Sequence, residues 1–195
     1  MSLHSLFNTL ANVFDGVEVI EQSGRNALLS AAHNANYNGA VNRLKKPFLD
    51  VMSEVDAHSV CKIIAQTPLP WSPPQTSGDS QYIAHSLPKV HVELVGPDGL
   101  VKSDIVRLGL YGILPNAEYG IRTHPAEEVF IMLAGQAHWK CGDEPYVAHG
   151  PGERSYHPSM MPHATRTADK AFLSAYVWCG DISTENYVYK GIPTN

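Results

Sequence analysis

Hydrophobic positions follow two different periods along this chain, and the change comes before its middle. Between Ser5 and Gln66 the apolar residues recur at the three- and four-residue spacing of amphipathic helices. The positions that form this pattern are Leu6, Leu10, Val13, Ala27, Leu28, Ala31, Ala32, Phe48, Val51, Met52 and Val55. Residues 1–66 are therefore predicted to form a helical subdomain that packs against the rest of the chain or against a second subunit.

A proline-rich segment then interrupts the pattern. Residues 67–81, TPLPWSPPQTSGDSQ, contain four prolines and are too polar for a regular element. We interpret this segment as a linker or as a loop over the mouth of a site. In a lid, Trp71 would be the natural apolar plug.

From Tyr82 onward, short runs of β-type residues alternate with turn residues. The runs are KVHVELVG, DIVRLGLYGIL, EEVFIMLAG, QAHWKCG, PYVAHG, RSYHP and AFLSAYVW. Many short strands without helical periods between them are typical of an antiparallel sandwich or a small barrel. The predicted fold is mainly β over residues 82–195, with an N-terminal α-helical extension.

Composition excludes several classes of protein. The chain has 195 residues and a net charge of −5, and its Lys and Arg residues are scattered, which argues against a nucleic-acid partner. Its three cysteines form no CxxC motif, which favours a reducing cytoplasm over a disulfide framework. We identify no secretion signal and no apolar run long enough to span a membrane. The expected molecule is a cytoplasmic monomer or homodimer with one main domain.

The stretch RTHPAEEVFIMLAG, residues 122–135, carries candidate chemistry. Pro125 and the β-branched and aromatic residues favour a strand. On one strand, His124, Glu128 and Phe130 would share a face with Arg122, because alternate residues point the same way. The opposite face would carry Glu127, Val129, Ile131 and Leu133. A barrel wall has this character when its interior is functional.

A second stretch, GERSYHPSMMPHATRT, completes a two-part pattern. The pattern is H-x3-E-x6-G followed by G-x5-P-x4-H, met by His124, Glu128, Gly135, Gly152, Pro158 and His163. It resembles the metal signature of the cupin superfamily and implies a cupin barrel. The chain departs from that signature at Arg122, where a histidine is usual, and at Met160 and Thr167. The remaining two imidazoles and one carboxylate suit Fe(II), Mn(II) or catalytic zinc, and the sequence does not choose among them.

Longer stretches resemble the DddQ-like branch of the cupin dimethylsulfoniopropionate (DMSP) lyases. They are YGIRTHPAEEVFIMLAGQAHWK, HGPGERSYHPSMMPHATRT and AFLSAYVWCGDISTENYVY. The resemblance implies a carbon–sulfur lyase that cleaves this sulfonium carboxylate to dimethyl sulfide and acrylate, with His124, Glu128 and His163 as metal ligands. The family often has a tyrosine two residues after the glutamate, where this chain has Phe130. Either that phenol is dispensable, or this chain is a variant that lacks it.

The elimination needs a base and a place for the sulfonium group. A metal on the substrate carboxylate would stabilise the developing charge, and Tyr119 could act as general base if the cation lowers its pKa from about 10. Aromatic faces hold a sulfonium best, and Trp178, Tyr176 and Phe130 are the candidate walls. The alternative for these rings is barrel core. Among the other histidines, His157 is the one expected to orient His163 or a carboxylate.

Two other functions use the same residues. An Fe(II)-dependent cupin dioxygenase would have the same three ligands, and oxygen consumption would distinguish it from a lyase. A non-catalytic cupin that binds a small molecule would explain the missing first imidazole and the phenylalanine at position 130. In that case, removal of the Tyr119 hydroxyl would change no measured output.

Overall fold

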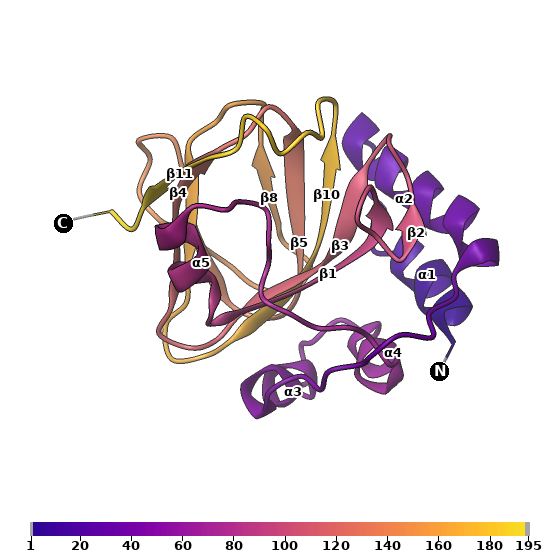
Figure 1. Ribbon diagram of the computed structural model, residues 1–195. Coiled ribbons are helices and arrows are strands. Elements are labelled where there is room, and N and C mark those ends of the chain that lie inside the picture. Colours follow the sequence, from indigo (N-terminus) through magenta and orange to yellow (C-terminus); the bar gives the residue numbers. More distant parts are fainter. Residues whose placement is uncertain (1, 194–195) are drawn as a thin grey trace.

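The computed structural model describes residues 2–193, and its centre is a barrel of two sheets (Figure 1). The strands are β1 (Lys89–Gly96), β2 (Val101–Lys102), β3 (Arg107–Ile113), β4 (Glu118–Thr123), β5 (Glu127–Gly135), β6 (Ala137–Cys141), β7 (Val147–His149), β8 (Arg154–His157), β9 (His163–Arg166), β10 (Phe172–Cys179) and β11 (Val188–Gly191). One sheet has the order β2-β1-β3-β10-β5-β8 and the other the order β11-β4-β9-β6-β7. The chain switches repeatedly between the sheets, as in the jelly-roll barrel of the cupins, so the predicted fold class is confirmed.

Helices cover the outside of this barrel (Figure 1). They are α1 (Leu3–Ala11), α2 (Val19–Ala31), the 3-10 turn η1 (Ala32–Asn34), α3 (Lys46–Met52), α4 (Cys61–Gln66) and α5 (Ser80–Ser86). Helices α2 and α3 pack on β5 and β10 of the six-stranded sheet, while α5 contacts β4 and β11 of the other sheet. The longest helix among residues 2–193 has 13 residues, and none combines the length and apolar character needed to cross a membrane.

Alternate residues of the central strands enter two separate hydrophobic clusters. On β5, Val129, Ile131 and Leu133 pack with the N-terminal helices, whereas Phe130 and Met132 face the barrel interior. The interior cluster is rich in aromatic rings. The two faces are divided as the alternation predicts, because a strand buried on both sides must satisfy a helix layer on one side and the barrel on the other.

The single strand expected over residues 122–135 is wrong. The chain bends at His124–Ala126, so that β4 ends at Thr123 in one sheet and β5 begins at Glu127 in the other. Pro125 lies in this bend, outside both strands, so its lack of an N–H does not interrupt a sheet. His124 and Glu128 therefore face each other across a corner of the barrel and do not sit side by side on one strand.

Three smaller expectations also differ. Residues 80–86 form helix α5, although β-type runs were expected from Tyr82; the Asp79 side chain caps this helix by accepting the Tyr82 N–H at 2.8 Å. Val55 lies beyond the end of α3 and is fully exposed, because Ser53 already caps that helix. Trp71 is 5% exposed and packs in the cluster shared with the helices, so it does not plug the site.

Candidate metal centre and its cavity

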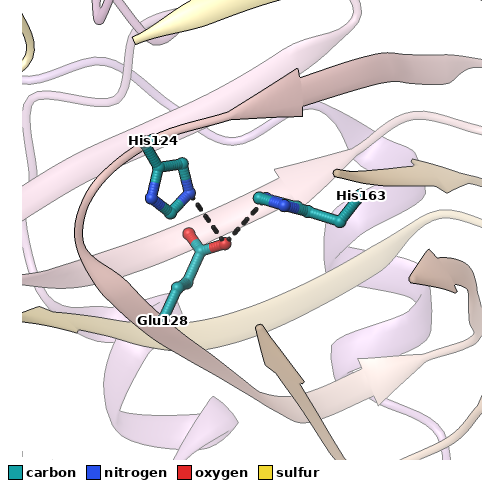
Figure 2. A group of neighbouring side chains, drawn as sticks. All are labelled: His124, Glu128 and His163. Atoms are coloured by element: carbon teal, nitrogen blue, oxygen red, sulfur yellow. Dashed lines mark ion pairs between the residues drawn. The ribbon is translucent and has the colours of Figure 1, made fainter. Parts of the chain in front are cut away.

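Three predicted ligands meet inside the barrel although they come from different elements. His124 lies in the bend after β4, Glu128 near the start of β5, and His163 at the start of β9 (Figure 2). Glu128 Oε2 is 3.5 Å from His124 Nε2 and 3.1 Å from His163 Nε2. All three side chains are at most 3% exposed, and one ligand atom from each lies within 4.8 Å of the others.

Hydrogen bonds fix which imidazole nitrogens face the centre. His124 Nδ1 lies 3.0 Å from the Ala126 carbonyl oxygen, and His163 Nδ1 lies 2.7 Å from that of Met161. A carbonyl only accepts, so each Nδ1 carries the proton and each Nε2 keeps a free lone pair. Neither Nε2 has a hydrogen-bond partner in the structure. Two buried lone pairs beside a carboxylate fit a divalent cation, so the group could bind a metal.

Glu128 is held in its ionised form by its neighbours. His157 Nδ1 lies 3.0 Å from Oε2, and the indole N–H of Trp178 donates to Oε1. Burial alone raises the pKa of Glu128, but the imidazoles around the carboxylate, among them the hydrogen-bonded His157, outweigh burial and bring the pKa well below its ordinary value. His157 thus contacts the carboxylate, as its expected orienting role requires, and its ring also stacks on His163 at 4.2 Å between centroids.

Two of the surrounding histidines, His163 and His157, are neutral near pH 7. Burial, followed by the positive charge of Arg122, lowers the pKa of His163 well below its ordinary value. Burial also lowers the pKa of His157. A neutral imidazole is the form that binds a metal, so the environment of His163 favours the form that could coordinate one.

A cavity of about 530 Å³ opens beside this group. The predicted substrate-contacting residues Phe130, Tyr176 and Trp178 line it, together with Tyr119 and Glu128. Residues 72–76 of the proline-rich segment lie along its wall. The segment therefore borders the cavity, and its role as a lid stays a prediction.

The aromatic walls also have structural contacts of their own. The ring of Trp178 stacks on His124 with centroids 4.1 Å apart, and the Tyr176 hydroxyl lies 2.7 Å from His91 Nε2. Phe130 packs against Trp139 at 4.5 Å between centroids. Each ring therefore serves the barrel core as well as the cavity surface.

Tyr119 is buried next to a second tyrosine. Its hydroxyl forms a hydrogen bond with the Tyr187 hydroxyl, and the Tyr187 ring lies parallel to that of His124 at 6.1 Å between centroids. Burial, and then the nearby Tyr187, raise the pKa of Tyr119 well above its ordinary value, while the charge of Arg122 acts in the opposite direction. The protein alone therefore keeps Tyr119 as a phenol near pH 7.

The sequence pattern did not bring out two residues at this site, Tyr187 and Lys89. Tyr187 precedes β11 in a segment without a clear period, so no signal placed it. Lys89 is 1% exposed at the start of β1, and alternation along KVHVELVG puts it on one face with His91 and Glu93. That polar face of a strand in a buried sheet was a usable signal for an interior lysine.

Comparison with known proteins agrees with this arrangement. The family model of dimethylsulfoniopropionate lyases matches residues 49–174, more than half of the chain. The DMSP lyase DddQ of Ruegeria pomeroyi is 37% identical over 91 residues, which cover 47% of this chain and 45% of that protein. The match thus spans less than half of the curated relative.

Solved structures of such lyases share the fold over nearly the whole chain. A structure from a set of the DMSP lyases RdDddP and RnDddQII has a TM-score of 0.65 at 17% identity, covering 96% of this chain and 97% of its own. The Ruegeria pomeroyi DddQ structure has a TM-score of 0.61 at 23% identity, with coverages of 95% and 96%. Since the family model matches more than half of the chain and includes both cupin motifs, the chain belongs to the dimethylsulfoniopropionate lyase family.

Proposed function

We propose that this protein is a metal-dependent lyase that cleaves dimethylsulfoniopropionate to dimethyl sulfide and acrylate by β-elimination. Family membership supports the reaction class. The observation that carries the proposal is the cavity itself, because Glu128 of the buried His-Glu-His group and Tyr119 line the same space. A small acid in that space would lie within reach of both.

His124, Glu128 and His163 are the proposed ligands of a single Zn(II), Fe(II) or Mn(II) ion. When bound, such a cation supplies Lewis acidity for the negative charge that develops on the substrate during proton removal. The chain contributes the rest. Backbone carbonyls orient both imidazoles, and His157 and Trp178 orient the carboxylate.

Tyr119 is the proposed general base. In the proposed step its phenolate oxygen takes the proton from the carbon next to the substrate carboxylate. The electrons of that C–H bond form the carbon–carbon double bond of acrylate, and the C–S electrons leave with neutral dimethyl sulfide. Because burial raises the pKa of Tyr119, the base needs nearby positive charge, which Arg122 supplies in part at 3.9 Å from the ring centroid.

Phe130, Tyr176 and Trp178 are the proposed walls for the sulfonium group. A sulfonium carries no N–H or O–H to donate, and the negative faces of aromatic rings attract a cation that has lost its water. All three rings line the cavity. This chain has Phe130 where the resemblance implies a tyrosine, so it would run the proposed reaction without that hydroxyl.

The products and the oxygen balance test the proposed function. Purified full-length protein supplied with divalent metal and DMSP should release dimethyl sulfide and acrylate in equal amounts without consuming oxygen. Two imidazoles and one carboxylate also serve Fe(II) oxygenases. Oxygen uptake that tracks substrate loss would replace the lyase with a dioxygenase, and ligand binding without any product would leave a non-catalytic cupin.

A further inference from the structure

The buried polar atoms that lack a hydrogen-bond partner in residues 2–193 divide into two chemical kinds. Two are the Nε2 atoms of His124 and His163, whose lone pairs suit a cation. The others can all donate a hydrogen bond: Lys89 Nζ, Tyr111 Oη, Arg122 Nη1 and Nη2, Trp139 Nε1 and Thr165 Oγ1. Donors gathered in this way need an acceptor that the described part of the chain does not provide.

These donors lie around the ring of Tyr119 in the barrel interior. The Arg122 guanidinium carbon lies 3.9 Å from the ring centroid and Lys89 Nζ lies 3.5 Å from it. The Tyr111 ring stacks on Tyr119 with centroids 5.9 Å apart. Thr165 of β9 is the register partner of Tyr119 on β4 and of Trp139 on β6, so these three residues form a row across the five-stranded sheet.

Arg122 in particular lacks a counterion. It is 2% exposed, and its two terminal nitrogens have no partner. Among described residues, the buried carboxylates are Glu21, which is paired with Arg154, and Glu128, which already accepts from His157 and Trp178. A buried guanidinium without hydrogen bonds is costly, so a site of this kind is built to receive an anion.

The anion can reach this place from the substrate cavity. Arg122, Tyr111 and Tyr119 line the same 530 Å³ cavity as Glu128. Lys89 does not line this cavity, and its Nζ lies over the ring of Tyr119. The guanidinium fork matches the two oxygens of a carboxylate, which it can bind through two parallel hydrogen bonds.

We propose that Arg122, with the Tyr111 hydroxyl, forms a carboxylate-binding subsite beside the metal centre that takes a small aliphatic acid. As the anchor of the lyase substrate, this subsite rests on the proposed function. It would hold the carboxylate end beside Tyr119, while the sulfonium end meets the aromatic wall of Phe130, Tyr176 and Trp178.

Binding of simple acids tests the subsite without any turnover. Acrylate and propionate would be titrated calorimetrically into the metal-loaded full chain, and again after chelation of the metal, with propionamide as an uncharged ligand of the same shape. We expect both acids to bind in both preparations and propionamide to bind at least 10-fold more weakly. Failure of the chelated protein to bind either acid would assign the carboxylate to the metal and overturn the subsite.

Substitutions then identify the residues that contribute to acid binding. Arg122→Met should weaken propionate binding at least 10-fold, and Tyr111→Phe, which removes one oxygen, should weaken it several-fold. Arg166→Met is the matched control, because Arg166 is exposed on β9 and lies on the ring of Tyr146 outside the cavity. Unchanged affinity in Arg122→Met overturns the proposal, and if that variant does not fold, unchanged affinity in Tyr111→Phe does.

The outcomes separate this inference from the proposed function. Metal-independent acid binding that is lost in Arg122→Met supports the subsite whether or not the protein releases dimethyl sulfide. Dimethyl sulfide release with no acid binding in the chelated protein contradicts the subsite and leaves the lyase intact.

Discussion

The surroundings of individual residues in this barrel determine their protonation states. Glu128 is kept ionised by its surroundings, which include the hydrogen-bonded His157; His163 is kept neutral by burial and Arg122, and Tyr119 is kept protonated by burial. Neighbouring ionisable groups can have different pKa shifts when their surroundings differ. One site can therefore contain both metal ligands and a general base. Each of these states makes a separate prediction.

Tyr119→Phe should lower kcat by about 10²- to 10⁴-fold, the range that a positioned base contributes. The metal content should stay unchanged, because Tyr119 is not a proposed ligand. Since the proposed base would act as a phenolate and burial raises the pKa of Tyr119, the wild-type rate should increase with pH through neutrality toward the alkaline range. Dimethyl sulfide release between pH 6 and 10 would measure this; a variant as active as the wild type removes Tyr119 from the mechanism.

His157→Ala should weaken metal binding by about 10- to 100-fold, because Glu128 loses a donor that orients it. Competition with a coloured chelator measures the affinity. His149→Ala serves as the control, since that imidazole bonds only to the nearby Val147 carbonyl. Equal affinities in the two variants would show that His157 does not support the metal centre.

Lys89→Met should stabilise the fold, and more at neutral than at alkaline pH. Burial and then Arg122 lower the pKa of Lys89 from 10.5 to about 6. The unfolded chain thus binds a proton that the folded chain does not between these values. The cost of Lys89 is largest at and below pH 6 and disappears as the pH rises above 10.5.

Urea unfolding at pH 7 and pH 10 tests this sign. The gain at pH 7 should be on the order of 2 to 4 kcal/mol and should shrink at pH 10. Lys62→Met, at an exposed position of α4, is the control and should change little at either pH. A gain independent of pH would mean that Lys89 does not titrate differently in the folded state.

At the scale of elements, the strict two-residue period made most strands predictable. KVHVELVG and EEVFIMLAG coincide with β1 and β5, because both faces of these strands are buried and every position is constrained. Helix α5 was missed because seven residues with one capping carboxylate leave almost no periodic signal. The corner at Pro125 was missed because strand parity is preserved across the four-residue step from His124 to Glu128.

The proline-rich segment combines a structural and a functional part. Trp71→Ala should lower the free energy of unfolding by about 3 to 5 kcal/mol, because the indole packs in the cluster shared with the helices. Gln75→Ala, at an exposed residue on the cavity wall, should leave stability unchanged and alter KM. Denaturation measures the stability of each variant, and steady-state kinetics measure its KM. A Trp71→Ala protein with normal stability but no turnover would show that Trp71 acts at the site and not in the core.

At the scale of the whole molecule, charge is arranged unevenly. The chain carries −5 overall, whereas the Arg122 guanidinium lies buried inside a barrel whose own buried carboxylate, Glu128, already contacts His157. Motif spacing could predict the His-Glu-His group because a metal demands a particular set of ligand types. It could not predict the buried Arg122, since the two terminal nitrogens of its guanidinium have no hydrogen-bond partner among the described residues. The oligomeric state, monomer or homodimer, stays a prediction.

The most direct test of the central claim is dimethyl sulfide release by the full chain, measured after metal removal and again after adding Fe(II), Mn(II) or Zn(II). The account predicts no release without metal, release with at least one metal, and no recovery in a His163→Ala protein. Release that persists without metal contradicts the metal-dependent mechanism. If neither the wild type nor a Phe130→Tyr protein releases dimethyl sulfide with any of the metals, the proposed lyase activity is contradicted.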